Sequence, residues 1–242
     1  GTSTPELVVS LKAALLGNSS ISLGNVVGSN IANIALILGV AALIKPLDVH
    51  AKVIMREIPI MIGISLLLLL LLLDGELGFI DGLVFVSGII TYTFVNVWMA
   101  RKEKSPEVDK EFKEGLKSKL GIPVSIVLMI AGLGLLILGA NLFVQSAVAI
   151  AKMFNVSDAI IGLTIVAIGT SLPELITSIV AAYKKESDIA IGNVVGSNIF
   201  NILGILGITA LIIPISSAGI SYIDLGVMLF TAIILFPLSR TG

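Results

Sequence analysis

Polar positions are sparse and grouped along this chain, and long apolar runs separate them. The runs "IPIMIGISLLLLLLLL" (58–73) and "IPVSIVLMIAGLGLLILGANLFV" (122–144) approach or exceed the ~20 apolar residues that a helix needs to cross a bilayer. Hydropathy along the whole chain predicts seven complete membrane helices and a partial first one, at about 1–16, 25–44, 53–73, 78–100, 122–145, 158–182, 189–213 and 221–238. The runs are too many and too late in the chain to be a signal peptide.

Composition supports a membrane protein and excludes several other classes. Hydrophobic residues make up 56% of the chain and charged residues 13%, and the mean hydropathy is +1.09, whereas soluble domains are about 45–50% apolar. The absence of cysteine excludes a disulfide framework and a thiolate metal site. No nucleophile and base pair or catalytic metal motif occurs, so we expect no enzyme and no cofactor. With a net charge of -1 and no basic face, the expected partners are the lipid bilayer and inorganic cations rather than nucleic acid.

One long polar segment, "RKEKSPEVDKEFKEGLKSK" (101–119), holds seven basic and five acidic residues. It divides the chain into a predicted N-terminal membrane half (1–100), a linker (101–120) and a C-terminal membrane half (121–242). Because Lys and Arg collect on the inner side of membranes, we expect the linker to be cytoplasmic. Loops on the same predicted side carry six more basic residues, and the opposite side holds little more than Lys12 and Lys152.

The chain contains an internal repeat. Residues 1–46 and 169–214 align without a gap at an offset of 168, and 28 of the 46 positions are identical. Repetition this strong indicates that both segments form the same structural unit. Five steps from span to span separate the copies, an odd number, so the copies are predicted to cross the membrane in opposite directions. An inverted repeat with a polar, proline-interrupted helix in each copy indicates a secondary transporter with its site near the bilayer midplane.

Each copy contains a polar motif inside an apolar helix, "GTSTPEL" (1–7) and "GTSLPEL" (169–175). Pro173 has no N–H and displaces the carbonyl four residues earlier, which frees the C=O of Gly169, and Pro5 does the same at Gly1. The side chains that share the face beside this break are Thr170, Ser171 and Glu174 in the second copy and Thr2, Ser3 and Glu6 in the first. A structural, purely hydrogen-bonding glutamate is the alternative, but intramembrane carboxylates are costly and usually functional, and this one is duplicated.

A second motif, "GNVVGSNIANI" (24–34) or "GNVVGSNIFNI" (192–202), follows in each copy. Its polar side chains are spaced i, i+4, i+8 and form one stripe, Asn25, Ser29 and Asn33 in the first copy and Asn193, Ser197 and Asn201 in the second. These oxygens, with no His, Cys or basic partner, suit hard cations, Ca²⁺ above all and then Na⁺. Its GxxxG glycines let helices approach closely. Four further polar residues are left open between interhelical hydrogen bonding and ion binding: Ser10, Ser178, Asn30 and Asn198.

These motifs resemble the calcium/cation antiporter superfamily, specifically its prokaryotic sodium/calcium exchanger branch. The resemblance implies an all-α transmembrane fold of ten helices in two inverted-topology repeats of five, in the inner (plasma) membrane, with ions bound between the second, third, seventh and eighth helices. It also implies, position by position, the ion-binding residues Thr2, Ser3, Glu6, Ser29, Asn33, Ala167 through its backbone carbonyl, Thr170, Ser171, Glu174, Ser197 and Asn201.

Two features depart from that pattern. Well-known exchangers of this branch have an aspartate at one of two asparagine positions, whereas Asn33 and Asn201 are both amides here, which leaves the coupling stoichiometry open. The second copy has 47 more residues upstream (122–168) than the first, and the 78–100 helix has no counterpart after residue 242. We therefore expect a fold truncated at both ends, lacking the first helix, half of the second and the tenth.

The predicted function is exchange of Ca²⁺ for Na⁺ by alternating access, with Glu6 and Glu174 neutralising one Ca²⁺. The alternative is a proton-coupled antiporter of Ca²⁺ or another divalent cation that uses the same two carboxylates. A cation channel is a different class, because it needs a continuous pore and gives uncoupled flux.

Overall fold

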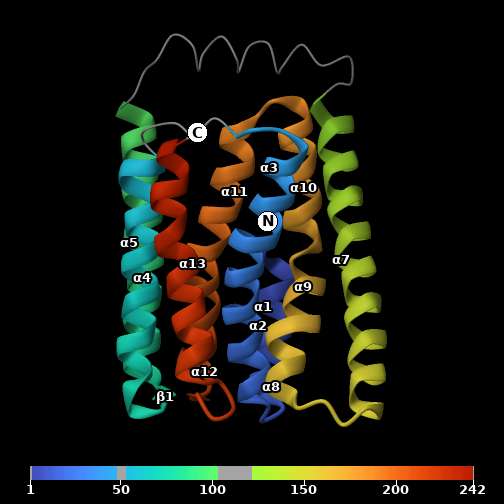
Figure 1. Cartoon of the computed structure of the whole chain (residues 1–242), viewed down its shortest axis with the longest axis vertical. Coiled ribbons are helices and arrows are strands. Elements are labelled where there is room, and N and C mark those ends of the chain that lie inside the picture. Colours follow the sequence, from blue (N-terminus) through green and yellow to red (C-terminus); the bar gives the residue numbers. More distant parts are fainter. Residues whose placement is uncertain (1, 48–52, 103–121, 242) are drawn as a thin grey trace.

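Helices form nearly all of the computed structural model, which describes residues 2–47, 53–102 and 122–241 (Figure 1). Within these ranges, five helices are long and apolar enough to cross a membrane: Ser19–Ile44, Val53–Asp74, Phe79–Met99, Ser187–Ile212 and Tyr222–Arg240. Asp158–Thr170 and Leu172–Tyr183 together form a further span, bent by 45°. The prediction of an all-helical membrane protein is confirmed, and the chain is a multi-pass integral membrane protein.

The two copies of the repeat fold into the same series of elements. The first copy forms α1 (Thr4–Leu15), α2 (Ser19–Ala32), the π-helical η1 (Asn33–Leu38) and α3 (Gly39–Ile44). The second copy forms α10 (Leu172–Lys184), α11 (Ser187–Phe200), the π-helical η5 (Asn201–Leu206) and α12 (Gly207–Ile212). From α2 onward every boundary recurs 168 residues later. The turns before α2 and α11 also match, because Gly17 and Lys185 both have positive φ, 79° and 68°.

The helix that leads into the second copy is broken just before Pro173, as the sequence predicts. It consists of α8 (Asp158–Ile161), the π-helical η4 (Gly162–Val166) and α9 (Ala167–Thr170). Ser171 leaves the helical region (φ −82°, ψ 6°), and Pro173 lies in the first turn of α10, where its missing N–H would have no partner in the helix. Ser3 has the same conformation (φ −80°, ψ 14°) ahead of Pro5.

The two copies run in opposite directions. In Figure 1, α2 rises to α3 near the upper end of the bundle, whereas α11 descends to α12 at the lower end. The helices α2 and α11 cross at a reciprocal pair of hydrogen bonds: Asn30 Nδ2 donates to the carbonyl of Asn198, and Asn198 Nδ2 donates to the carbonyl of Asn30, both at 3.2 Å. A reciprocal pair of this kind is what a two-fold relation between the copies produces.

Other helices flank the repeats. In chain order they and their short connections are η2 (Val53–Glu57), α4 (Ile58–Leu71), η3 (Leu72–Asp74), β1 (Glu76–Leu77), α5 (Phe79–Lys102), α7 (Ile122–Met153), β2 (Ile215–Ser216) and α13 (Tyr222–Thr241). The two-residue strands β1 and β2 pair antiparallel and join the loop after α4 to the loop after α12, a small addition to the helical architecture. The predicted linker is helical at its start, since α5 continues to Lys102, and its residues from 103 on lie outside the described part.

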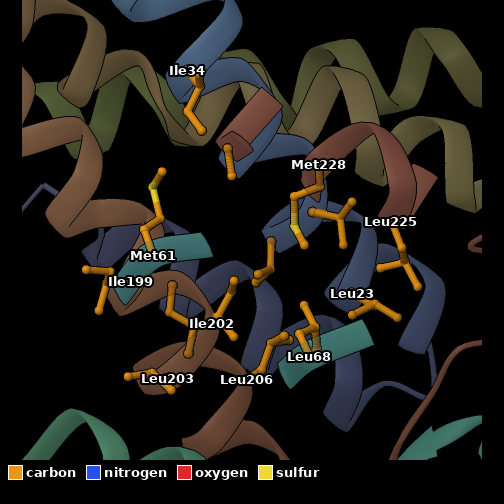
Figure 2. Close-up of a cluster of buried hydrophobic side chains, with 14 of the residues drawn as sticks. Leu23, Ile34, Met61, Leu68, Ile199, Ile202, Leu203, Leu206, Leu225 and Met228 are labelled. Atoms are coloured by element: carbon orange, nitrogen blue, oxygen red, sulfur yellow. The ribbon is translucent and has the colours of Figure 1, made fainter. Parts of the chain in front are cut away.

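The apolar core lies between the repeats and the flanking helices α4 and α13. Figure 2 shows part of it, and the residues drawn there include Leu23 of α2, Met61 and Leu68 of α4, Leu206 of η5 and Met228 of α13. Outward-facing residues are also apolar, for example Leu70 and Phe94, which are 51% and 69% exposed. Because apolar residues occupy both the interior and the outer surface, the buried polar residues stand out as a separate group.

Candidate cation-binding site

Buried polar side chains gather where α1 and α10 begin and where α2 and α11 cross. Glu6 and Glu174 are both fully buried, with 0% of each side chain exposed. The structure connects the predicted residues in three hydrogen-bonded groups: one around Glu6, one around Glu174, and one of asparagines at the helix crossing. All eleven predicted residues belong to one of these groups: Thr2, Ser3, Glu6, Ser29, Asn33, Ala167, Thr170, Ser171, Glu174, Ser197 and Asn201.

Each carboxylate is held by a serine from the other copy. Ser171 Oγ donates to Glu6 Oε1 at 3.1 Å, and Ser3 Oγ donates to Glu174 Oε1 at 2.8 Å. Both serines stand at the break that precedes a proline, so the non-helical residue aims its hydroxyl across to the other copy. The site is therefore complete only where both copies pack together.

Two asparagines bind the backbone of the glutamates. Asn25 Nδ2 donates to the backbone carbonyl of Glu6 (3.3 Å) and to Ser10 Oγ (2.9 Å), and Asn25 Oδ1 accepts from Thr170 Oγ1 (3.0 Å). The second copy repeats the pattern, since Asn193 contacts the carbonyl of Glu174, Ser178 Oγ and Thr2 Oγ1 at 3.3–3.4 Å. The predicted ligands Thr2 and Thr170 thus hold the asparagines that position the glutamate helices.

A four-asparagine network orients two further predicted ligands. Asn33 Nδ2 donates to Asn198 Oδ1, and Asn201 Nδ2 donates to Asn30 Oδ1, both at 2.9 Å. The amide nitrogens of Asn33 and Asn201 therefore face the crossing of α2 and α11, and their oxygens face away from it. Asn30 and Asn198, which the sequence left open, act as the anchors of this network.

Four buried oxygen atoms of the site have no hydrogen-bond partner. They are Glu6 Oε2, Glu174 Oε2, Asn33 Oδ1 and Asn201 Oδ1, one each from α1, α10, η1 and η5. Buried polar atoms are normally paired, and these four can only accept. Outside this set, the described residues contain just two other unpaired buried side-chain atoms, the hydroxyls of Ser22 and Thr209. Carboxylate and amide oxygens of this kind are the ligands that hard cations take in proteins.

No positive side chain competes for the carboxylates. Among the described residues, neither Glu6 nor Glu174 forms an ion pair with a lysine, arginine or histidine. Nor do the described residues contain a group of three or more His, Cys, Asp or Glu side chains that could hold a metal. The site thus combines two carboxylates with neutral oxygens, as the sequence motifs predict.

The two copies differ in how the site is covered. Gly24 and Gly28 of α2 pack against η4, and a Cβ on Gly28 would collide with the carbonyl of Leu163. On α11, Gly192 and Gly196 have no atom within 4 Å of a Cβ position. A cavity of about 260 Å³ lies beside them, lined by Thr2, Ser3, Gly192, Asn193, Gly196, Ser197 and Phe200.

Because of this difference, the equivalent serines of the two copies have different hydrogen-bond partners. Ser29 Oγ donates to the carbonyl of Ala167 at 3.3 Å, because α9 lies over α2. Its counterpart Ser197 donates instead to Glu174 Oε1 at 3.3 Å. The Ala167 carbonyl, predicted as a ligand, also accepts from Thr170 Oγ1 (3.3 Å) and from the Ser171 N–H (3.0 Å). It is therefore surrounded by donors, unlike the four unpaired oxygens.

Comparison with known proteins identifies the family. The model of the family described as "Sodium/calcium exchanger protein" matches residues 1–98 and 124–240. The chain belongs to the sodium/calcium exchanger family. This exchanger-family chain is 40% identical over 238 residues to the inner membrane protein YrbG of Escherichia coli, covering 97% of this chain and 73% of that protein. It is 32% identical to the sodium/calcium exchanger MaX1 of Methanosarcina acetivorans, covering 100% of this chain and 79% of MaX1.

The fold comparison agrees. The exchanger-family chain superimposes on the sodium-calcium exchanger NCX_Mj with a TM-score of 0.78 and 32% identity, covering 100% of this chain and 76% of that one. The predicted resemblance is confirmed, and the chain is a member of a transporter family rather than an enzyme.

Residues outside the predicted ligand set also shape the site. Asn25 and Asn193 belong to the polar stripe but lie outside the predicted ligand set, and the sequence does not decide between two roles for Asn30 and Asn198. The repeat could have indicated these asparagines as site residues, since Asn25 and Asn193, like Asn30 and Asn198, are related by the offset of 168 that relates the predicted ligands.

Proposed function

We propose that the protein exchanges Ca²⁺ for Na⁺ across the membrane by alternating access, and that the eleven predicted residues form its ion-binding region. The observation that carries the proposal is the set of four unpaired oxygens, two from carboxylates and two from amides, drawn from both copies. Ca²⁺ takes six to eight oxygen ligands in proteins. The four unpaired oxygens, with the remaining lone pairs of Ser3 and Ser171, provide most of such a shell, and Glu6 and Glu174 neutralise its charge.

The inverted copies supply the means of alternation. We assign the chain to a ten-helix fold of two inverted halves joined by a cytoplasmic linker, in a prokaryotic inner membrane. In such transporters one repeat rocks against the other around a site near the midplane. Since each glutamate is hydrogen-bonded to a serine of the other copy, movement between the copies changes both carboxylates' surroundings at once. The similarity to MaX1 and NCX_Mj, both sodium/calcium exchangers by name, supports the choice of ions.

The test is ion flux in proteoliposomes that contain the protein. With ⁴⁵Ca²⁺ inside and equal pH on both sides, an inward Na⁺ gradient should drive Ca²⁺ out, with a sigmoidal dependence on Na⁺. If a pH gradient drives Ca²⁺ and a Na⁺ gradient does not, the proton-coupled alternative replaces this proposal. Ca²⁺ flux that needs no counter-gradient would instead indicate a channel.

A further inference from the structure

We propose that a groove between α4 and α5 binds one anionic phospholipid, with an acyl chain along the groove and the phosphate at Arg56. None of the eleven proposed ion-binding residues lines this groove, so lipid binding there does not depend on which ions the protein carries. The shape of the groove, its length and the basic residues at one end of it point to this ligand.

The groove is a hollow of about 510 Å³ between the two helices. Its α4 wall consists of long apolar side chains such as Ile60 and Ile64, and its α5 wall contains small residues, among them Gly88 and Thr91. Leu203 of η5 forms the floor, since a Cβ on Gly88 would lie 3.2 Å from the Cδ2 atom of Leu203. Small residues on one wall therefore leave room for an acyl chain.

The length of the groove matches one leaflet of the bilayer. It extends from Arg56 to Leu67 on α4 and from Val95 to Val84 on α5, and the end residues are 11 positions apart on each helix. At 1.5 Å per residue each wall is ~16 Å long, and half of a hydrocarbon core is ~15 Å thick. Val84 and Val95 are 44% and 37% exposed, so the groove opens on the outer surface, where acyl chains surround the protein.

Arg56 lies at one end of the groove, near the membrane interface. Its Nη2 donates to Asn96 Oδ1 at 2.7 Å, and Asn96 precedes Trp98 by two residues, which is ~3 Å along the helix. Trp98 is 55% exposed, and Lys102 Nζ lies 5.1 Å from the centroid of its ring. Tryptophans of membrane helices collect at the level of the lipid headgroups. The Arg56 guanidinium therefore lies where a phospholipid of this leaflet carries its phosphate.

The charge at this end of the groove is positive. Glu57 is the only acid within η2 and the last two turns of α5. Its Oε1 lies 3.7 Å from Arg56 Nη1, and its Oε2 accepts from the Tyr92 hydroxyl at 2.5 Å. Two exposed cations, Arg101 and Lys102, end α5. Basic pockets between membrane helices bind anionic headgroups, and a guanidinium can hold a phosphate through two hydrogen bonds. An apolar helix in the groove would bring no such anion.

The test is native mass spectrometry of the protein released from nanodiscs that contain equal amounts of phosphatidylcholine and phosphatidylglycerol. We expect one lipid to stay bound and phosphatidylglycerol to be preferred. Arg56→Gln should reduce this preference at least about tenfold, because hydrogen bonds to a charged group are lost. Arg240→Gln is the control, since Arg240 is an exposed arginine beside Met55 and Phe236 that does not line the groove. Equal retention of both lipids, or an unchanged preference in Arg56→Gln, would overturn the inference.

A second pair of variants tests the groove itself without altering Arg56. Thr91→Trp fills the groove, whereas Thr93→Trp places the same ring on the exposed surface outside it. We expect Thr91→Trp to lose the bound lipid and Thr93→Trp to keep it, and this comparison decides if Arg56→Gln does not fold. Retention of the lipid by both variants would overturn the inference. A dimer that carries no lipid and is lost in Thr91→Trp would also overturn it, because the groove would then receive a helix of a second copy.

Discussion

At the scale of single residues, four of the proposed ligands use one terminal atom for fixing their position and leave the other free. Glu6 and Glu174 give Oε1 to a serine hydroxyl and keep Oε2 unpaired, while Asn33 and Asn201 give Nδ2 to another amide and keep Oδ1 unpaired. A ligand held in this way keeps its orientation without an ion, so less ordering is needed when an ion binds. The free atom of each residue is therefore the one we expect to contact the cation.

Neutralising either glutamate should abolish Ca²⁺ exchange. Glu6→Gln and Glu174→Gln keep the size of the side chain and remove one of two buried negative charges. Removing the carboxylate from a buried pair of a carboxylate and a cation costs about 2–5 kcal/mol. This corresponds to at least about a 30-fold loss of Ca²⁺ affinity. Flux and Ca²⁺ binding should fall while membrane insertion continues, and Glu76→Gln, at the exposed residue of strand β1, is the control. Near-normal uptake in either variant would remove that carboxylate from the site.

Removing an anchor of the amide network should weaken ion binding without touching a proposed ligand. Asn198→Ala deletes the oxygen that accepts from Asn33 Nδ2 and leaves that nitrogen without its partner. An unsatisfied buried donor costs about 1–3 kcal/mol, so Ca²⁺ affinity or thermal stability should fall by that amount. Asn96→Ala, which disrupts a hydrogen bond far along the chain from the site, should leave Ca²⁺ affinity unchanged. An Asn198→Ala protein with normal affinity and stability would show that the network does not orient Asn33.

At the scale of elements, hydropathy predicted the five spans and the bent pair among the described residues, and Pro173 predicted the break, because these signals depend on local sequence. The π-helical segments η1 and η5, which begin at Asn33 and Asn201, had no local signal. Such segments often occur at functional sites, and here each begins at a proposed ligand. The serine partners of the glutamates were also beyond sequence reasoning, since Ser3 and Ser171 meet their carboxylates only after the copies pack.

Equivalent glycines of the two copies should respond in opposite ways to a methyl group. In Gly28→Ala the Cβ would strike the carbonyl of Leu163, so α2 and η4 must separate, at a cost of about 1–3 kcal/mol. In Gly196→Ala the Cβ meets no atom within 4 Å, and alanine in place of a helical glycine stabilises by about 0.5–1 kcal/mol. Thermal unfolding of residues 1–242 in detergent measures both effects.

Comparing Gly28→Ala with Gly196→Ala separates the effect of packing on stability from the effect of helix propensity. Both substitutions change glycine to alanine in the same motif, at positions 168 apart, so propensity alone predicts the same shift for both. We expect the midpoint to fall for Gly28→Ala and to hold or rise for Gly196→Ala, at ~2–4 °C per kcal/mol. Equal shifts would mean that the close approach of α2 and η4 does not contribute to stability.

At the scale of the whole molecule, two antiparallel copies place a polar centre between an apolar core and an apolar outer surface. The sequence predicted this arrangement from an odd number of spans between the copies. It could not predict that α8, η4 and α9 cover α2 while the matching face of α11 borders a cavity. That difference arises from which segments pack on each copy, and residues 1–46 and 169–214 are too similar to reveal it.

The opposite orientation of the copies predicts opposite accessibility of equivalent residues. Leu16 follows α1 and Lys184 ends α10, and both side chains are exposed although they occupy equivalent positions 168 residues apart. The chain has no cysteine, so Leu16→Cys and Lys184→Cys each introduce a single reactive thiol. In intact cells a membrane-impermeant maleimide should label Leu16→Cys, because the lysine-rich loops are expected on the cytoplasmic side. The same reagent should label Lys184→Cys only after the membrane is opened. Labelling of both thiols from one side would show that the copies are parallel and would remove the structural basis for alternating access.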